Sequence, residues 1–581
     1  MNINTLLGSK KLSNFLWKTY REDPQNLETE SHRLLHRSGF ISQVSSGIFS
    51  FLPIGWRSIE KIKNIIREEM NNSGALEINM PVIQSSDLWR NSGRLDTFIP
   101  PLARFNDRRE NEMIVAPTHE ETVTDMVAKN VNSYRDLPFT LYQIQTKYRE
   151  EPRPRGGLLR VREFEMKDAY SFDKDQEGLD VSYKKMVEAY KKIFSRCSTE
   201  VVIVDADSGA IGGKESNEFI MLADSGEDVI LISEDQQYAA NVEKAIFKKD
   251  LYEKEQEENL EIIDTPNIKT IKQLQDFLKI PPYKTLKTVV YKFDKKIIGC
   301  VIRGDYEINE TKLRNYLNAT YLEPASEKDI VDLGLIPGFI SPYDVDDIDF
   351  IYDDSVSMGP ENFIIGSNIL DKHYKNFNIS RDLGEVKTLD IAEAKEGFIS
   401  VGGSALTSKK GIEVGHVFKL GDAYTKKMDA KFSTSQGSEE NILMGCYGIG
   451  VGRLLAACIE ANREENSMNL PISIAPFSIY LAALQVDDKE VMKISEKLFS
   501  ELSSFGFDVL FDDRDAQPGV KFNDSELLSL PFRIIVSKRN LESGLLEIFS
   551  RDENITDKLS FEQTIESVSY THLTLPTKRI V

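Results

Sequence analysis

The sequence contains no apolar run of the about 20 residues that a membrane-spanning helix needs. Its first residues, MNINTLLGSKKLSNFLWKTYRED, lack the apolar core of a secretory signal peptide, so we expect a cytoplasmic protein without a membrane partner. The cysteines are scattered and show no metal-ligand spacing: Cys197, Cys300, Cys446 and Cys458. We therefore expect a reducing compartment and no zinc.

Positive charge is also scarce, because 72 Lys and Arg residues face 93 Asp and Glu residues, for a formal net charge of −21. This balance argues against a protein that binds nucleic acid through its overall charge, but it allows local basic patches. One such patch lies between Arg149 and Arg162, where five arginines occur. The 581 residues are enough for several domains with large cores. The spacing of apolar residues predicts a mainly helical segment over 1–75.

Residues 141–170 carry the most informative pattern, which predicts a β-hairpin. Side chains alternate with period two, so the first strand has one polar face: Gln143, Gln145, Arg149 and Glu151. Prolines and glycines over 152–157 predict an exposed turn. The second strand returns with a similar face: Arg160, Arg162, Phe164, Met166 and Asp168. An ordinary hairpin would leave such a face in water, whereas this combination of carboxylates, guanidiniums and an aromatic ring indicates a binding surface.

The spacing Arg149-x-Glu151, a loop, then Arg160-x3-Phe164-x3-Asp168 resembles motif 2 of the class II aminoacyl-tRNA synthetases. The resemblance implies that Arg149 holds the α-phosphate of ATP and the amino-acid carboxylate, and a planar guanidinium suits both anions. It implies that Glu151 meets the adenine amino group, that Phe164 stacks under the base and that Arg160 helps to bind ATP. It also implies that two arginines of the turn meet the tRNA: Arg153 and Arg155.

Two earlier segments extend this resemblance. Residues 74–81 end a predicted helix and begin a strand, and they resemble motif 1, which implies a homodimer interface. Thr118-x-Glu120 resembles the proline-binding loop of prolyl-tRNA synthetases, where a hydroxyl and a carboxylate accept both N–H donors of proline. Such a triplet alone is a common helix start, and its position between motifs 1 and 2 favours binding. We expect His119 and Glu121 to face solvent or to support this loop.

The glycine-rich segment 445–453, followed by an apolar helix, lacks the third glycine of a dinucleotide fingerprint because Arg453 stands there, and it also lacks a P-loop lysine. It resembles motif 3 of the same class. The resemblance implies that Arg453 stacks over adenine opposite Phe164 and meets the γ-phosphate, and that Cys446 lines the proline pocket. Two glycines would let the backbone approach ATP: Gly448 and Gly450.

Two further segments resemble the wall of such an active site. The first is 208–222, which would place Glu218 and Phe219 near the pocket. The second is 410–418, which would place His416 beside the amino acid. A lone histidine can equally be a packed structural group, so both interpretations of His416 stay open.

From 238 to 396 the sequence becomes rich in Asp, Glu and Lys and interrupts the catalytic unit. This segment resembles the editing insertion of bacterial-type prolyl-tRNA synthetases, which is shared with free-standing aminoacyl-tRNA deacylases. The resemblance implies editing roles for Lys287, with Lys284 as a rival, and for His373 and Gly334. A proline pocket cannot exclude the smaller alanine by size, and each missing methylene is worth only about 1–3 kcal/mol, so a hydrolytic second site would add discrimination.

Strands and helices alternate over 475–566, and this part resembles the anticodon-binding domain of the same subgroup. The resemblance implies tRNA contacts by Asp512, Arg514 and Lys521. The last stretch, 567–581, resembles translated adapter sequence, so we expect a non-native, disordered tail.

These motifs identify the chain as similar to the bacterial-type prolyl-tRNA synthetases over 1–566. The resemblance implies a multidomain α/β protein with a class II antiparallel-sheet catalytic core, an inserted α+β editing domain and a C-terminal α/β anticodon-binding domain. The expected parts are the core in two pieces, the insertion, the anticodon-binding domain and the tail: 1–237 with 397–474, 238–396, 475–566 and 567–581.

The resemblance implies ATP-dependent attachment of proline to tRNA(Pro) through prolyl-adenylate, with ATP bound as its Mg²⁺ complex, and hydrolysis of mischarged alanyl-tRNA. The sequence assigns no residue to Mg²⁺. Two alternatives stay open, a catalytically inactive paralogue that binds tRNA and a deacylase whose synthetase body only presents tRNA. The synthetase is favoured because the residues that the chemistry needs are intact: Arg149, Glu151, Phe164 and Arg453.

Overall fold

A computed structural model describes residues 10–24, 27–213 and 215–578. Two compact units make up the chain. Unit 1 contains Met1–Val202, Ser208–Glu227 and Gly411–Val581, and unit 2 contains Ile203–Asp207 and Asp228–Lys410. The insertion expected over 238–396 lies within unit 2, which begins earlier and ends later. Among the described helices, none has the length and apolar character that crossing a bilayer requires.

The apolar spacing predicts a mainly helical segment over 1–75, but the N-terminal part of unit 1 also contains strands. Two helices flank a hairpin, in the order α1 (Glu30–Arg37), β1 (Ile41–Ser45), β2 (Ile48–Phe51) and α2 (Pro53–Asn72). Gly47, at φ +74°, permits the turn that separates the two strands. Thr29 caps α1, and Pro53 begins α2 where its missing N–H costs nothing.

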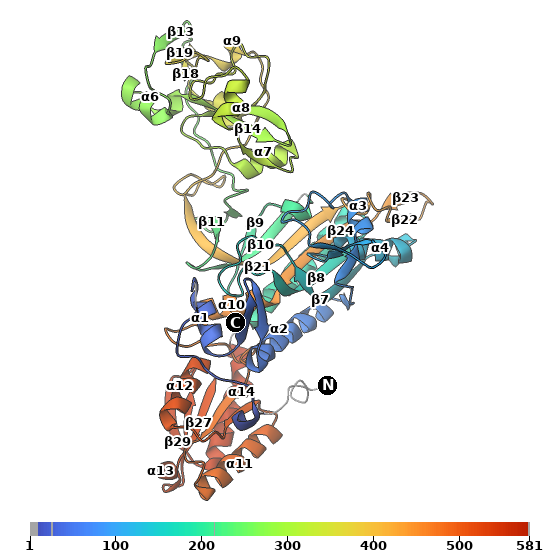
Figure 1. The fold of residues 1–581 in the computed structure, drawn as a ribbon, viewed down its shortest axis with the longest axis vertical. Helices are drawn as coiled ribbons and strands as arrows, with labels where there is room; N and C mark the ends of the chain where they lie inside the picture. Colours follow the sequence, from blue (N-terminus) through green and yellow to red (C-terminus); the bar gives the residue numbers. More distant parts are fainter. Residues whose placement is uncertain (1–9, 25–26, 214, 579–581) are drawn as a thin grey trace. The chain divides into compact units, whose positions relative to one another are not determined.

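An antiparallel sheet forms the centre of unit 1 (Figure 1). In spatial order its strands are β10 (Glu215–Leu222), β21 (Leu406–Gly421), β24 (Leu443–Gly450), β8 (Glu163–Asp173), β7 (Phe139–Tyr148) and β3 (Leu76–Glu77). The predicted hairpin is β7 and β8, with Gln143 paired to Asp168 and Tyr148 paired to Glu163. Strand β3 runs parallel to β7, whereas the other neighbours are antiparallel.

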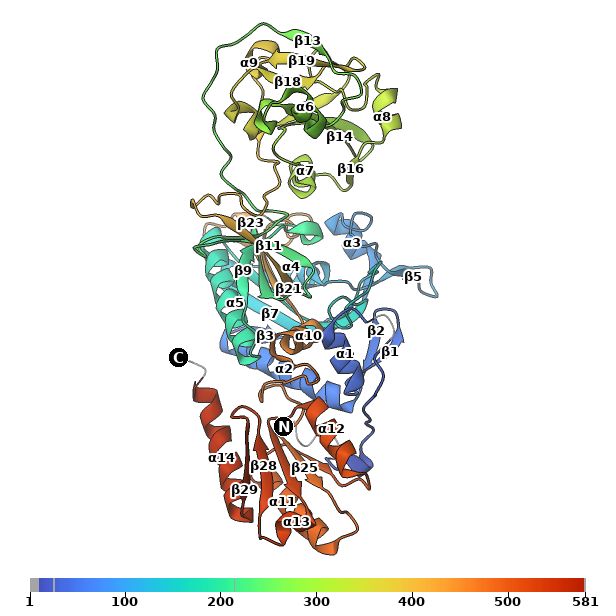
Figure 2. The ribbon, with the colours of Figure 1, turned by 90° about the vertical axis from the view of Figure 1, so that its left-hand side faces the viewer.

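One face of this sheet is covered by helices (Figures 1 and 2). Helix α5 (Gln176–Arg196) packs on β8 and β24, α10 (Val451–Asn462) packs on β8, and α2 packs on both helices. Phe219 lies here, because its ring packs 5.3 Å from those of Tyr190 and Phe194. Phe219, which was expected near the pocket, therefore faces the helices, whereas its strand neighbour Glu218 points to the other face. The opposite face is left for a site.

Smaller elements border the central sheet. Strands β4, β6 and β5 form a sheet beside α3 and α4, and β22 pairs with β23. Their bounds are β4 (Ile83–Ser85), α3 (Ser86–Ser92), β5 (Arg104–Asn106), β6 (Glu112–Val115), α4 (Glu120–Asn130), β22 (Lys431–Ser433) and β23 (Glu439–Asn441).

The C-terminal part of unit 1 is a mixed sheet with helices. The strands, in spatial order, are β26 (Val509–Asp512), β25 (Ile479–Ala483), β27 (Phe532–Val536), β28 (Leu546–Ser550) and β29 (Ile555–Leu559). The helices are α11 (Lys489–Ser504), α12 (Pro518–Leu528), α13 (Lys538–Leu541) and α14 (Phe561–Lys578). Helix α14 continues through 567–578, which form most of the tail that was expected to be disordered. Phe561, Ile565 and Val568 recur at helical spacing and join the apolar core, while 579–581 lie outside the described residues.

Unit 2 contains an α+β body built on two sheets. One has the strands β16 (Leu322–Pro324), β14 (Leu286–Phe293), β15 (Lys296–Arg303), β17 (Asp349–Asp353) and β20 (Thr388–Leu389). The other has β13 (Glu261–Asp264), β19 (Lys372–Phe377) and β18 (Phe363–Gly366), and a bridge between Thr285 and Ile364 joins the sheets. The remaining elements are β9 (Val202–Asp205), β11 (Asp228–Ser233), β12 (Ala239–Asn241), α6 (Ile271–Leu278), α7 (Glu310–Leu317), α8 (Glu327–Asp332) and α9 (Ile379–Asp382).

Candidate active site

The strand registers gather most of the expected site residues on the face that the helices leave open. Directly paired residues project to the same face of a sheet. Lys147 pairs with Phe164 near the turn of the hairpin. Farther along the strands, the register pairs Gln143 with Asp168, Asp168 with Gly448, Gly448 with His416, and His416 with Glu218. One line across β7, β8, β24, β21 and β10 therefore carries a set of functional groups that come from distant parts of the sequence.

Arg149 lies just beyond β7 with its positive charge uncompensated. Its Nε donates to the carbonyl of Pro117 at 3.3 Å, and its guanidinium carbon lies 5.4 Å from the centre of the Phe164 ring. No carboxylate of the described residues lies within ion-pair distance of Arg149. Burial, and secondly the charge of Arg453, lower the pKa of Arg149. A half-buried guanidinium without a carboxylate partner is suited to bind an anionic group of a ligand.

The other charged residues of the hairpin are tied into pairs. Arg160 Nε contacts Glu151 Oε2 at 3.0 Å, and Arg160 Nη1 contacts Glu227 Oε2 at 3.1 Å. Arg155 also pairs with Glu227. The backbone N–H of Arg153 donates to Glu151 Oε1 at 3.1 Å, whereas the Arg153 residue is exposed. Arg153 is thus the arginine of the turn with a side chain available for a partner.

The turn is less exposed than its composition suggests. Gly156 and Gly157 are buried, with φ of +65° and +63°. A Cβ at Gly157 would lie 2.8 Å from the Cβ of His32, and the N–H of Gly156 donates to Glu28 at 2.8 Å. The prediction of an exposed turn over 152–157 is therefore wrong for its glycines, which allow the close approach of α1.

Thr118 and Glu120 form a second, negative pole. Thr118 Oγ1 donates to Glu120 Oε2 at 2.6 Å, and Cys446 Sγ donates to Glu120 Oε1 at 3.2 Å. Arg94 Nη1 lies 3.6 Å from Glu120 Oε2 and 2.8 Å from Glu121 Oε1. Burial, then the charge of Glu120, raises the pKa of Cys446 well above its ordinary value, so the thiol stays a donor. Glu121 is fully buried, so it does not face solvent. Of the two expectations for Glu121, the one that remains is that it supports the loop of Thr118 and Glu120.

A buried network beneath this pole was not found from the sequence. Lys147 Nζ lies 2.8 Å from Asp168 Oδ1 and donates to His119 Nδ1 at 2.8 Å, while His119 Nε2 lies 3.0 Å from the carbonyl oxygen of Pro81. Asp168 Oδ2 also accepts from two neutral groups, the side chains of Gln143 and Tyr170. Burial, then the charge of Lys147, lower the pKa of His119 to about 4, so its ring is neutral. The alternation of side chains along β7 puts Lys147 on the same face as Arg149. This pattern could have revealed Lys147 as a member of the network.

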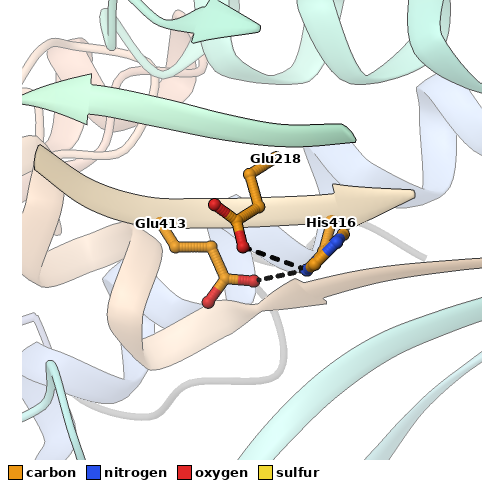
Figure 3. A group of neighbouring side chains, drawn as sticks. All are labelled: Glu218, Glu413 and His416. Carbon is orange, nitrogen blue, oxygen red and sulfur yellow. Dashed lines mark hydrogen bonds and ion pairs between the residues drawn. The ribbon is translucent and has the colours of Figure 1, made fainter. Parts of the chain in front are cut away.

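A third cluster joins Arg453 of α10 to side chains of β21 and β10. Figure 3 shows the members of this cluster that come from the two strands, Glu218, Glu413 and His416. Arg453 Nη1 contacts Glu413 Oε2 at 2.7 Å, and Arg453 Nε donates to the carbonyl of Leu159 at 2.9 Å. His416 Nδ1 lies 3.1 Å from Glu413 Oε1 and 3.7 Å from Glu218 Oε1. Burial alone would raise the pKa of Glu413, but the hydrogen bond from His416 and the charge of Arg453 hold it well below its ordinary value.

This cluster changes the expected place of His416. Its described contacts are with the two carboxylates and with the Phe418 ring, whose centre lies 3.9 Å away, and not with Thr118 or Glu120. The ligating atoms of Glu218, Glu413 and His416 lie within 4.8 Å of one another. Carboxylate oxygens are the ligands that Mg²⁺ prefers, so the two glutamates fit a divalent cation.

The expected editing residues of unit 2 are only partly brought together. Lys287 Nζ contacts Glu307 at 2.6 Å on β14, and His373 Nδ1 contacts Thr265 Oγ1 at 2.6 Å on β19. Burial lowers the pKa of His373 to about 4. No contact in the described residues joins Lys287 to His373. The rival Lys284 pairs with Glu255.

Gly334, the third residue with an expected editing role, ends a helix. It is exposed, has φ of +73° and follows α8, where its N–H donates to the carbonyl of Val331 at 2.9 Å. These are the features of a glycine that ends a helix. The loop that follows reaches His373 through Phe339, whose ring centre lies 5.3 Å from that of the histidine. The structure shows a helix-ending role for Gly334, and its expected editing role stays a prediction.

Of the three residues expected to contact tRNA in the C-terminal part of unit 1, two are buried in the structure. Asp512 and Lys521 are buried, and Lys521 Nζ donates to the carbonyl of Ala483 at 2.6 Å. Arg514 Nη2 contacts Asp512 Oδ2 at 2.6 Å and Asp524 Oδ2 at 2.8 Å, and its side chain is 24% exposed. Asp512 and Lys521 therefore hold β26 and α12 together and have no surface for RNA, whereas Arg514 keeps a partial surface.

Comparison with protein families gives two matches. Residues 104–462 match the tRNA synthetase class II core domain (G, H, P, S and T), and residues 473–570 match an anticodon binding domain. Among curated proteins, the chain is 47% identical over 559 residues to a Proline--tRNA ligase of Dehalococcoides mccartyi, covering 96% of this chain and 98% of that one. It is 43% identical over 556 residues to a Proline--tRNA ligase of Fusobacterium nucleatum, covering 95% and 97%.

Among solved structures, the chain is similar to the prolyl-tRNA synthetase of Cryptosporidium parvum complexed with L-proline and AMP. The TM-score is 0.56 at 13% identity, covering 95% of this chain and 77% of that one. At this identity the likeness concerns the fold.

Proposed function

Because the chain belongs to the bacterial-type proline–tRNA ligases, the class II synthetases that attach proline to tRNA, we propose that the open face of its sheet activates proline with ATP as prolyl-adenylate. One observation carries this proposal. The face holds a positive pole at Arg149 and a buried negative pole at Glu120. An amino acid has the complementary pair of charges, a carboxylate and an ammonium.

Activation begins when the proline carboxylate attacks the α-phosphate of ATP and pyrophosphate leaves. The carboxylate is already ionised, so the step needs positioning and charge stabilisation and no general base. Arg149 holds the carboxylate and the α-phosphate together, and Arg453 meets the distal phosphates. Phe164 offers the adenine a ring to stack on. The 3′-hydroxyl of the terminal adenosine of tRNA then attacks the prolyl carbonyl, and AMP leaves.

ATP enters as its Mg²⁺ complex, and the chain has carboxylates that fit the cation. Glu218 and Glu413 would supply oxygen ligands, while His416 orients Glu413 through the contact at 3.1 Å. The cation supplies neutralisation of the phosphate charge. Glu413 is held ionised by Arg453 and His416, which keeps it suited to this role.

Thr118 and Glu120 receive the secondary ammonium of proline. The carboxylate of Glu120 and the hydroxyl of Thr118 can accept its two N–H donors. Cys446 closes the pocket beside Glu120 with a small side chain. Arg94 contacts both Glu120 and Glu121, so it holds the loop in place. Its single positive charge is divided between two carboxylates, which leaves negative charge at Glu120 for the ammonium of proline.

ATP–pyrophosphate exchange measured with each amino acid tests this function. We expect exchange with proline, and weaker exchange with alanine because alanine is smaller than the pocket. An inactive paralogue or a pure deacylase would give no exchange with any amino acid, and that result would contradict the proposal.

We also propose that the body of unit 2 hydrolyses alanyl-tRNA(Pro), with Lys287 and His373 as the residues that serve it. Lys287 is 16% exposed and carries a positive charge at a strand surface, where it can hold a phosphate of the tRNA 3′ end. The neutral ring of His373, held by Thr265, can hydrogen-bond to the ester.

Lys287→Ala is expected to retain proline-dependent exchange and to lower alanyl-tRNA hydrolysis about 10²-fold, in line with the loss of one electrostatic contact at a reacting group. Hydrolysis of alanyl-tRNA(Pro) under single-turnover conditions measures this. Lys284→Ala is the matched control, because Lys284 is an ion-paired lysine of similar exposure three residues away, and it should leave hydrolysis unchanged. Equal rates of alanyl-tRNA hydrolysis by the wild type and Lys287→Ala would contradict the proposed role of Lys287 in editing.

We further propose a cytoplasmic homodimer. Its interface would include the motif 1 segment, where Leu76 of β3 is 61% exposed, and the nearby Ile83 of β4, which is 41% exposed. Arg153, exposed in the turn, would meet the acceptor stem of tRNA(Pro).

A further inference from the structure

A cavity of about 540 Å³ lies in unit 1, and none of the residues assigned above lines it. Its walls come from three segments, the N-terminal stretch 18–24, helix α1 and the hairpin of β1 and β2. Ligand pockets in proteins commonly have volumes of about 300–1,000 Å³. The cavity is therefore large enough for a nucleotide or a molecule of similar size.

Flat rings form part of its walls. The ring of Tyr20 stacks on that of His36, with centres 4.8 Å apart, and His32 meets Phe49 edge-on with centres 6.1 Å apart. His32 is 7% exposed, and its Nδ1 has no hydrogen-bond partner in the described part of the chain. Aromatic and imidazole rings are the surfaces on which proteins stack unpaired bases. Burial lowers the pKa of both histidines, which leaves neutral rings that can donate and accept hydrogen bonds.

Two cations of the lining are uncommitted. Lys18 and Arg21 are exposed and form no ion pair within the described ranges, although Lys18 Nζ lies 4.9 Å above the Tyr20 ring. The lining also contains Glu22 and Asp23, and Asp23 lies 4.0 Å from Arg37. The cations suit a phosphate, and the carboxylates suit the amino groups of a base.

The cavity wall is in contact with the motif 2 turn. The space for a Cβ at Gly157 is filled by the side chain of His32, and the N–H of Gly156 is held by Glu28. Gly47 at the hairpin turn accepts from the N–H of Arg162 at 2.8 Å. A group bound in the cavity would therefore lie beside the turn that carries Arg153.

We propose that this cavity binds one unpaired nucleotide at the acceptor end of the tRNA, with its base against the rings of Tyr20, His32 and Phe49 and its phosphate at Lys18 and Arg21. This proposal rests on the proposed function, because it takes the RNA that Arg153 meets as the ligand. It adds a second contact on the acceptor end, built by α1 and the N-terminal stretch.

The double variant Lys18→Ala/Arg21→Ala tests the phosphate contact, since both side chains are exposed and their loss should not unfold the chain. The probe is an RNA minihelix with the tRNA(Pro) acceptor sequence and its unpaired 3′ end, and binding is followed by fluorescence anisotropy against salt concentration. We expect affinity to fall about tenfold and the salt slope to fall by roughly 0.7, as for one phosphate of a single strand. Lys191→Ala/Lys192→Ala, which removes the same charge from α5, should leave both unchanged.

Tyr20→Leu tests the base contact and should weaken binding of the same minihelix about tenfold. A blunt duplex of the same sequence should bind wild type and variants equally. Equal losses for the blunt duplex and the minihelix, or no loss for either, would overturn the proposal. Proline-dependent exchange should stay at the wild-type rate in all these variants. Absence of exchange in the wild type would instead contradict the proposed function, so the two failures are distinguishable.

Discussion

Arg149→Ala is expected to lower kcat/KM for proline-dependent ATP–pyrophosphate exchange about 10³-fold or more. Removal of a single donor that stabilises developing charge in a buried site costs about 10²–10³ in rate, and Arg149 is expected to serve two anions at once. The structure gives the reason for the large effect. The guanidinium is half-buried beside Phe164 and has no carboxylate partner among the described residues, so its charge is available to a ligand.

Two variants make this expectation specific. Arg149→Lys keeps the charge but loses the planar fork that holds two oxygens, so it should recover only a small part of the activity. Arg153→Ala removes an exposed arginine of the same hairpin and should leave exchange unchanged while raising the KM for tRNA. Exchange by Arg149→Ala within tenfold of the wild type would show that another group holds the α-phosphate.

The hairpin shows what alternation alone can predict. Period two placed Gln143, Phe164 and Asp168 on one face, and the register of β7 and β8 puts them there. The family models confirm the class II core and the anticodon-binding domain that the motifs indicated. Patterns that repeat within one element are thus readable, because the geometry of a strand fixes them locally.

Long-range packing explains what the sequence did not reveal. Lys521 looks like an exposed basic residue, yet its ammonium is held by the carbonyl of Ala483 on a different strand. Gly157 belongs to a turn whose composition is typical of exposed loops, but the side chain of His32 covers it. In both cases the partner is distant in the sequence, so composition could not decide between solvent and a buried contact. The same holds for Lys147, whose partners His119 and Asp168 come from two other segments.

Lys147→Met is expected to reduce the free energy of unfolding of unit 1 by about 3–5 kcal/mol, because it leaves the Asp168 carboxylate buried without its cation. Both side chains are essentially inaccessible and 2.8 Å apart. Burial by itself raises the pKa of Asp168, but the charge of Lys147 and the hydrogen bonds from Lys147 and Gln143 hold it below its ordinary value. The carboxylate is therefore ionised in the folded chain and needs a counter-charge.

Urea denaturation followed by tryptophan fluorescence measures the free energy of unfolding of unit 1. The three tryptophans lie at Trp17, Trp56 and Trp89, all within unit 1. Lys129→Met is the control, because the pair of Lys129 with Asp125 is solvent-exposed on its lysine side and should contribute less than about 1 kcal/mol.

The double variant Lys147→Met/Asp168→Asn decides whether the effect belongs to the pair. Asparagine keeps a side-chain oxygen for Gln143 and Tyr170 but removes the charge, so the double variant should be more stable than Lys147→Met alone. If the stability losses of Lys147→Met and Asp168→Asn, each measured alone, add up to the loss of the double variant, Lys147 and Asp168 act independently. That result would contradict the proposed coupling between the two side chains. His119 bonds to Lys147 through one ring nitrogen and contacts Pro81 through the other, and it directly precedes Glu120. Lys147→Met should therefore also raise the KM for proline, whereas the Lys129→Met control should not.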